Sequence, residues 1–173
     1  QTQMLQQIFC LGPEDVDLPG FPLFSLFTIT MGMRSVVPRM DPSKPAKANP
    51  KKLVQAIIDQ KVTFAAGSPA IWQGVAAYCL RKKITLPSLK YLVMFGAPVP
   101  IKLHQMFAPI LTGGTTYTPY GATEALPIAT ISGETILSET AAQTVQGEGV
   151  CVGEVTLGVK AKIIALSEEQ ISN

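Results

Sequence analysis

Residues 49–83 read NPKKLVQAIIDQKVTFAAGSPAIWQGVAAYCLRKK, and this stretch decides the fold. Apolar residues recur at helical spacing through 51–60 and again through 70–83. Between these two patterns, residues 62–66 form a short apolar run with the length and composition of a buried strand. A helix, a buried strand and a second helix in succession predict βαβ units built around a parallel sheet.

Both helices have well-marked starts. Asn49 and Ser68 belong to the residue types that cap helix N-termini, and each is followed by a proline, which suits the first helical position. In the first helix, the apolar residues Leu53, Val54, Ile57 and Ile58 recur at helical spacing. The sequence therefore predicts two amphipathic helices that pack one side against the sheet.

Outward from this stretch, five more short runs have the character of buried strands. They are Val16 to Leu18, Arg34 to Val37, Tyr91 to Phe95, Thr115 to Thr118 and Pro127 to Ile131. A third helix is expected from about Pro100 to Leu111. We therefore predict an α/β fold with a doubly wound parallel sheet and helices on both faces.

The alternation of short strands and helices in the sequence ends at about Ser132. Residues 147–153 are rich in glycine, and residues 155–166 alternate between apolar and polar as an antiparallel strand does. We expect residues 1–132 to form a partial α/β subdomain and residues 133–173 to begin a small antiparallel β subdomain.

Composition narrows the function classes. The chain has 173 residues, of which 47% are hydrophobic and 15% charged, with a net charge of +2. This content of apolar residues favours a packed core over disorder, and the low charge argues against nucleic acid as a partner. The longest apolar stretch, Phe21 to Met33, is shorter than the roughly 20 residues that a membrane-spanning helix needs.

The cysteines and the single histidine carry no recognisable metal or catalytic pattern. Cys10, Cys79 and Cys151 are too far apart for a CxxC metal site and do not form a disulfide framework, which favours a reducing, cytoplasmic setting. His104 has no His, Cys or paired carboxylate beside it on its predicted helix. We expect it to be a half-exposed surface residue.

The segment Thr118 to Ala125 follows a predicted strand and reads TPYGATEA. The ring of Tyr120 can lie flat on a base, while Thr123 offers a hydroxyl to a phosphate and Glu124 a carboxylate to Mg²⁺. Ligands of open parallel sheets bind at the carboxyl ends of strands. On spacing alone, the same residues also fit a simple turn followed by a short capped helix.

A second segment, Met94 to Pro100, also follows a predicted strand. Gly96 and Ala97 have little side chain to keep a planar ligand away from their backbone groups. Taken alone it would fit a tight strand-to-helix turn. If the two segments bind one ligand, Gly96 and Tyr120 must lie side by side at the same edge of the sheet.

Together the two segments resemble the adenylate-forming superfamily, which includes acyl-CoA synthetases, peptide-synthetase adenylation domains and luciferases. Residues 120–124 are similar to its Tyr-Gly-x-Thr-Glu motif, and residues 96–98 to its adenine-facing segment. The similarity extends over nearly the whole chain. Five segments most resemble the branch that converts β-hydroxy fatty acids in bacterial olefin biosynthesis: 21–24, 40–42, 67–70, 118–127 and 149–153.

The resemblance implies a role for each matched residue. The implied ATP or AMP contacts are Gly96, Ala97, Pro98, Thr118, Pro119, Tyr120, Gly121, Ala122 and Thr123. Thr123 and Glu124 would be catalytic, with Glu124 also binding Mg²⁺. Phe21, Phe24, Gly67 and Ser68 would approach the acyl group of the substrate.

The implied reaction is ATP-dependent activation of a carboxylic acid, expected to be long-chain, as an acyl-adenylate with release of pyrophosphate. The resemblance leaves open whether thioester formation with coenzyme A, lactone closure or transfer to a carrier follows. The family's phosphate loop, ribose-binding Asp and C-terminal catalytic Lys are not found in residues 1–173. We therefore expect an internal part of the N-terminal domain that is inactive alone. The alternative is a non-catalytic nucleotide-binding or interaction module.

Overall fold

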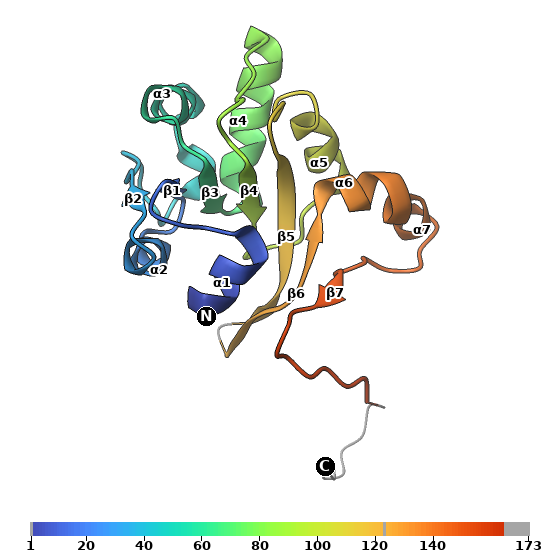
Figure 1. Cartoon of the computed structure of the whole chain (residues 1–173). Coiled ribbons are helices and arrows are strands. Elements are labelled where there is room, and N and C mark those ends of the chain that lie inside the picture. Colours follow the sequence, from blue (N-terminus) through green and yellow to red (C-terminus); the bar gives the residue numbers. More distant parts are fainter. Residues whose placement is uncertain (1, 123, 165–173) are drawn as a thin grey trace.

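The computed structural model of the chain describes residues 2–122 and 124–164. These residues form one mixed sheet with the strand order β2-β1-β3-β4-β5-β6-β7 (Figure 1). The strands are β1 (Val16–Pro19), β2 (Arg34–Ser35), β3 (Phe64–Gly67), β4 (Tyr91–Met94), β5 (Thr115–Ala122), β6 (Ala125–Ser132) and β7 (Glu154–Val155). The pairings among β1 to β5 are all parallel, which confirms the predicted α/β class.

Helices cover both faces of this sheet (Figure 1). They are α1 (Thr2–Phe9), α2 (Ser25–Thr30), α3 (Pro50–Gln60), α4 (Pro69–Lys82), α5 (Ile101–Phe107), α6 (Gly133–Thr135) and α7 (Ala141–Val145). Two 3-10 turns, η1 (Pro22–Phe24) and η2 (Pro45–Lys47), and the π-helix η3 (Ile136–Thr140) complete the elements.

The predicted helix starts are confirmed. The Asn49 side chain accepts a hydrogen bond from the Lys52 N–H at 3.3 Å, and the Ser68 hydroxyl accepts one from the Ala70 N–H at 3.2 Å. Each cap satisfies a backbone donor that the first helical turn leaves without a partner. The caps fix the residues at which α3 and α4 begin, after β2 and β3 respectively.

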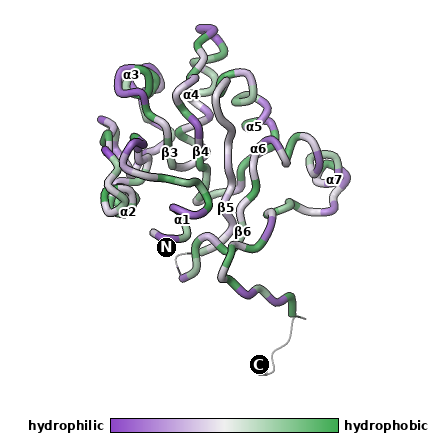
Figure 2. Tube along the Cα trace, viewed as in Figure 1, coloured by the Kyte–Doolittle hydropathy of each residue, from purple (hydrophilic) through white to green (hydrophobic). Residues whose placement is uncertain are grey.

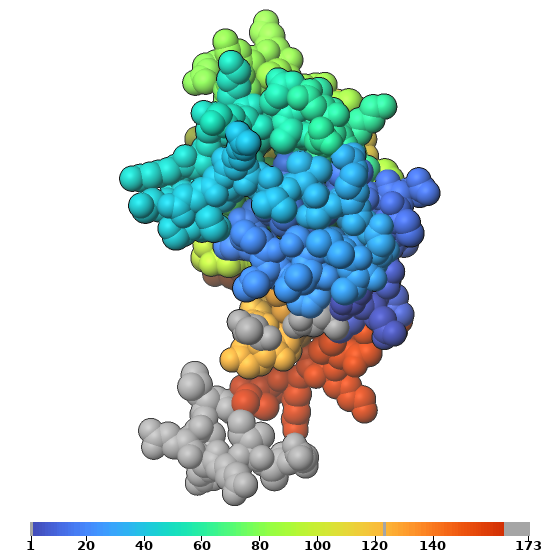
Figure 3. Space-filling view, turned by 90° about the vertical axis from the view of Figure 1, so that its left-hand side faces the viewer, coloured from blue at the N-terminus to red at the C-terminus, as the bar shows by residue number. Residues whose placement is uncertain are grey.

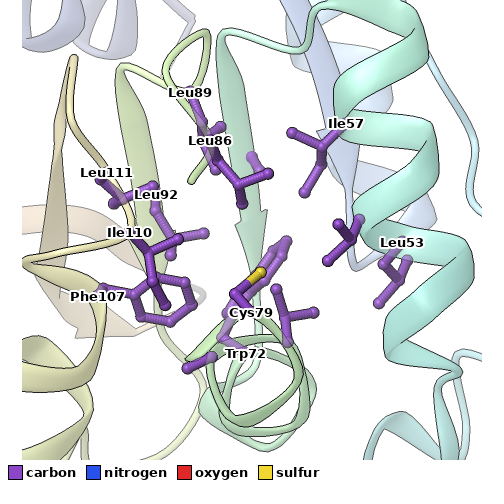
Figure 4. Packing of buried hydrophobic residues seen from close by; sticks show 14 of the residues in the cluster. Leu53, Ile57, Trp72, Cys79, Leu86, Leu89, Leu92, Phe107, Ile110 and Leu111 are labelled. Atoms are coloured by element: carbon purple, nitrogen blue, oxygen red, sulfur yellow. The ribbon is translucent and has the colours of Figure 1, made fainter. Parts of the chain in front are cut away.

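Successive residues of a strand contribute their side chains to two separate hydrophobic cores, one on each face of the sheet. Leu92 and Met94 of β4 belong to the larger core under α3, α4 and α5, whereas Val93 between them belongs to a smaller core that includes Phe9 of α1. In the larger core, the side chains of Leu53, Trp72 and Phe107 come from three different helices and meet over the sheet (Figure 4). The alternation follows from the two-residue period of a strand.

The surface helix α3 is amphipathic, as the sequence predicts. Figure 2 shows α3 with both hydrophobic and hydrophilic residues around its circumference, and its buried positions are Leu53, Val54 and Ile57. The side drawn in Figure 3 is formed by α2, the connection after β2 and α3. Leu23 and Leu26 are 75% and 61% exposed in this region.

One strand differs from the prediction. The run Pro127 to Ile131 was expected to be parallel, but it lies in β6, which pairs antiparallel with β5. A connection as short as the one between Ala122 and Ala125 can join only antiparallel neighbours, since a parallel pair needs a crossover. The same hairpin extends β5 through Gly121, where the sequence predicted a turn after Thr118.

Beyond Ser132 the chain forms α6, η3 and α7, none of which the sequence analysis predicted. Antiparallel pairing resumes when β7 joins β6, and Glu154 lies opposite Thr130. The division into subdomains 1–132 and 133–173 stays a prediction. Within residues 2–122 and 124–164, none of the helices has the length and apolar character needed to cross a bilayer.

Candidate nucleotide site

The residues at the carboxyl ends of neighbouring parallel strands meet at one edge of the sheet. In the register, Gly67 lies opposite Met94 and Val93 lies opposite Tyr117, so the chain segments that follow β3 and β4 emerge beside the second half of β5. This arrangement brings together the two segments that the sequence singled out. They line one cavity of about 770 Å³, within the size range typical of small-molecule sites.

One wall of the cavity is formed by predicted residues. It includes Gly96, Ala97 and Pro98 after β4, and Thr118 to Gly121 of β5. The expectation that Gly96 and Tyr120 lie at the same sheet edge is therefore confirmed. Their contacts with a nucleotide stay a prediction.

The conformation of Gly96 explains why glycine stands there. Its φ is +85°, a region that other L-residues rarely adopt, and the point where a Cβ would stand is 3.6 Å from the Phe21 ring. Gly96, Ala97 and Pro98 are exposed. Their backbone groups therefore face the cavity with little side chain in the way.

Tyr120 offers its ring to the cavity and is 54% exposed. The pairing of β5 with β6 is irregular between Tyr120 and Ala122. A Cβ on Gly121 would stand 2.5 Å from the Ala125 carbonyl oxygen, so only glycine allows the hairpin to close this tightly. The hairpin thus holds an aromatic ring at the cavity without packing it into the core.

The turn of this hairpin carries the residues expected to be catalytic. Thr123 lies outside the described residues. Glu124 is exposed, next to the end of β5 that bears Tyr120 and Ala122. Mg²⁺ in nucleotide sites is commonly held by one or two carboxylates together with phosphate oxygens and water. A single exposed carboxylate fits that donor set, but Glu124 is not among the residues that line the cavity.

The expected acyl-binding phenylalanines form an aromatic cluster at the same edge. The ring centroids of Phe21 and Phe95 are 5.3 Å apart, those of Phe24 and Phe95 are 4.7 Å apart, and Phe27 packs on Phe24 at 5.8 Å. A small cavity of about 30 Å³ lies behind the cluster on the α1 and α2 side and is lined mainly by apolar residues, including Phe24 and Phe95. A cavity of this volume has room for about one water molecule, so it does not by itself hold an acyl chain.

Gly67 and Ser68, also expected near the acyl group, have evident structural roles. Gly67 is buried, and a Cβ there would stand 3.2 Å from both the Gly20 Cα and the Trp72 Nε1. The Ser68 hydroxyl caps α4. Glycines at the ends of β1 and β3 therefore let the two backbones approach closely behind the aromatic cluster.

The prediction for His104 is wrong, because the residue is 2% exposed rather than half-exposed. Its Nδ1 lies 2.7 Å from the Thr116 hydroxyl and its Nε2 lies 3.5 Å from the Thr118 hydroxyl. Burial lowers the pKa of the imidazole to about 4, so the ring is neutral at pH 7. Hydroxyl partners on the neighbouring strand compensate for burying a polar ring, and the spacing along its own helix gives no sign of them.

The opposite wall of the cavity was missed by the sequence analysis. It consists of Ile136, Thr140 and Thr144 from η3 and α7, and of residues 150–152. The i, i+4 spacing of Thr140 and Thr144 was the available signal, since it places both hydroxyls on one side of a helix. The short helices lack the long apolar stripe by which such elements are normally recognised.

Comparison with known proteins agrees with this geometry. Residues 20–171 match the family model described as AMP-binding enzyme. The chain is 40% identical over 172 residues to the olefin beta-lactone synthetase of Xanthomonas campestris pv. campestris, covering 99% of this chain and 30% of that protein. It is 38% identical over 174 residues to the protein of the same name from Stenotrophomonas maltophilia, covering 100% of this chain and 31% of that one.

A solved structure supports the fold. The O-succinylbenzoate coenzyme A synthetase of Bacillus subtilis, in complex with AMP, superposes with a TM-score of 0.68 at 17% identity, over 90% of this chain and 30% of that one. At this level of identity the likeness concerns the fold alone. The chain spans about 30% of the length of the two synthetases that it matches.

Proposed function

Since the chain belongs to the AMP-binding enzyme family, we propose that it forms the nucleotide-binding part of an ATP-dependent ligase that activates a carboxylic acid. The observation that carries the proposal is the shared cavity of the Gly96 segment and Tyr120. Adenine would stack on the Tyr120 ring and lie against the exposed backbone of Gly96, Ala97 and Pro98. Thr118 and Gly121 line the same cavity and would contact the nucleotide as well.

In the proposed reaction, a carboxylate oxygen of the acid attacks the α-phosphorus of ATP. A bond forms between that carboxylate oxygen and the α-phosphorus. The bond between the α-phosphorus and the oxygen that bridges the α- and β-phosphates breaks, and pyrophosphate leaves. Glu124 would hold Mg²⁺, which neutralises phosphate charge when it is bound. Thr123 would contact the α-phosphate. Positioning and charge neutralisation supply most of the catalysis in reactions of this kind.

The acid is proposed to be long-chain and β-hydroxylated. The support is the similarity to two olefin beta-lactone synthetases and the aromatic cluster of Phe21, Phe24 and Phe95 beside the larger cavity. Phe21 would lie between the acyl group and the nucleotide, because its ring contacts the Gly96 position. The step after adenylation stays open among lactone closure, thioester formation with coenzyme A and transfer to a carrier. The three free cysteines fit the proposed cytoplasmic setting.

The products test this proposal. A complete ligase containing the chain, incubated with ATP, Mg²⁺ and a long-chain β-hydroxy acid, is expected to release AMP and pyrophosphate in step with acid consumption. Release of ADP and phosphate would contradict adenylation. Nucleotide binding with no acid-dependent turnover would favour the non-catalytic nucleotide-binding module instead.

A further inference from the structure

His104 occupies a position that links the two nucleotide segments. It lies on α5, which follows the Gly96 segment directly, and its side chain faces Thr116 and Thr118 of β5, the strand that carries Tyr120. His104 and Thr118 both line the nucleotide cavity. One buried imidazole therefore ties together the elements that hold both halves of the proposed adenine site.

The ring is held tightly on the Thr116 side. Its Nδ1 lies 2.7 Å from Thr116 Oγ1. A Cβ on Gly133, at the start of α6, would stand 1.9 Å from Thr116 Oγ1 and 3.0 Å from Nδ1. Only glycine can pack there, so α6 closes over the pair. The short contact and the close backbone fix the orientation of the imidazole plane.

The hydroxyl of Thr116 determines the tautomer. Thr116 is 3% exposed, and His104 is the one hydrogen-bond partner found for its hydroxyl among residues 2–122 and 124–164. A hydroxyl has a single proton to donate, and a buried hydroxyl that donates no hydrogen bond costs stability. We therefore assign Nδ1 as the acceptor and place the proton of the neutral ring on Nε2.

The remaining ring N–H is directed at Thr118. Nε2 lies 3.5 Å from Thr118 Oγ1, the outer limit for a hydrogen bond, and such contacts commonly shorten when ligand binds. A hydroxyl that accepts from Nε2–H keeps its own proton for another partner. Thr118 also lines the cavity, so that partner can be a bound ligand.

We propose that His104 is a positioning residue of the nucleotide site, which orients the Thr118 hydroxyl as a hydrogen-bond donor toward an acceptor atom of bound AMP. This inference rests on the proposed function, because it requires a nucleotide in the cavity. It assigns His104 a role through Thr118 and no contact with the reacting atoms.

The only histidine of the chain makes the tautomer directly measurable. A sample with isotope-labelled histidine gives one imidazole spin system by NMR, and its two nitrogen shifts distinguish Nδ1–H from Nε2–H. We expect the Nε2–H pattern at pH 7 and a shift of the Nε2 signal when AMP is added. An Nδ1–H pattern would overturn the proposal, as would an Nε2 signal that stays fixed while AMP perturbs Tyr120.

Variants separate positioning from packing. His104→Leu and Thr118→Val each remove the proposed contact, and we expect AMP affinity to fall about fivefold in either, as for loss of one neutral hydrogen bond. The double variant should lose no more than either single one, because both act through one hydrogen bond. Thr118→Ser keeps the hydroxyl and should bind nearly as the wild type does. His104→Gln keeps a side-chain N–H donor and should recover part of the loss.

The control is Gln105→Ala, an exposed neighbour on α5 that should change neither affinity nor melting. If His104→Leu fails to fold, the AMP affinities of Thr118→Val and Thr118→Ser still test whether the Thr118 hydroxyl contributes to binding. Additive losses in the double variant, or Thr118→Val with wild-type affinity, would overturn the inference and leave the proposed function intact. Failure of a complete ligase containing the wild-type chain to bind AMP would overturn both.

Discussion

The ring of Phe21 lies 3.6 Å from the point where a Cβ atom of Gly96 would stand. Phe21 follows β1 and Gly96 follows β4, so the Phe21 ring joins the ends of two separate strands. The contact places the aromatic cluster next to the cavity that we propose as the nucleotide site. A bound acyl group and a bound nucleotide would be brought together at this point.

Gly96→Ala is expected to weaken AMP binding, because the methyl group strains a left-handed backbone and enters the space beside Phe21. The matched control is Gly147→Ala, where φ is +93° and no atom lies within 4 Å of the added Cβ. Both variants should lose roughly 1 kcal/mol of stability to backbone strain. Calorimetric titration with AMP should show weaker binding only for Gly96→Ala, and equal affinities would refute the assignment.

Tyr120 is predicted to contribute by stacking. Tyr120→Leu should reduce AMP affinity about tenfold or more, since aromatic stacking on a base is worth about 1–3 kcal/mol. Tyr120→Phe keeps the ring and serves as the control. Because Tyr120 is 54% exposed, neither change should move the melting temperature by more than a degree or two. A Tyr120→Phe loss as large as that of Tyr120→Leu would show that the hydroxyl, not the ring, binds.

The strand and helix succession could be predicted from the sequence because local signals mark it directly. Asn49 and Ser68 cap α3 and α4 as expected, and the strands before and after them were short buried runs. The direction of β6 could not be predicted in the same way. Pro127 to Ile131 looks like any buried strand, and only its pairing with β5 shows that it is antiparallel.

The parts of the candidate site that could be predicted are those whose informative residues stand together in the sequence, as in the Gly96 segment and around Tyr120. It was not predictable where partners come from distant elements. His104 of α5 can be buried because Thr116 and Thr118 of β5 offer hydrogen-bond partners to its two ring nitrogens. Thr140, Thr144 and residues 150–152 form the far wall of the cavity only because the chain folds back over β5.

Asp17 is a buried carboxyl group on β1, next to the edge strand β2, and is 1% exposed. The Thr28 hydroxyl donates to its Oδ2 at 2.6 Å, whereas Oδ1 and the nearby Ser35 hydroxyl have no partner among the described residues. Burial raises the pKa of Asp17 to about 6, against the opposing effects of the Thr28 hydroxyl and the nearby Ser35 hydroxyl. Asp15, by contrast, has Lys90 at 3.5 Å and the Thr63 hydroxyl at 2.9 Å.

Asp17→Asn is therefore expected to stabilise the chain above pH 6 by about 1–2 kcal/mol, because the amide removes a buried charge and can donate to Ser35. A raised folded-state pKa means that wild-type stability is full below about pH 4 and falls as pH rises through about 6. The gain should thus vanish by pH 4. Melting curves across this range check it, with Asp15→Asn destabilising at pH 7 as the contrast. A gain that is independent of pH would contradict the account.

The most direct test of the central claim is exchange of radiolabelled pyrophosphate into ATP by a complete ligase containing this chain. Glu124 is exposed, so Glu124→Gln should leave the melting temperature within about a degree of wild type. We predict wild-type exchange that requires a long-chain β-hydroxy acid and falls at least ~100-fold in Glu124→Gln, as expected for loss of a group that neutralises phosphate charge. Exchange at the wild-type rate in Glu124→Gln, or no acid-dependent exchange in the wild type, would contradict the account.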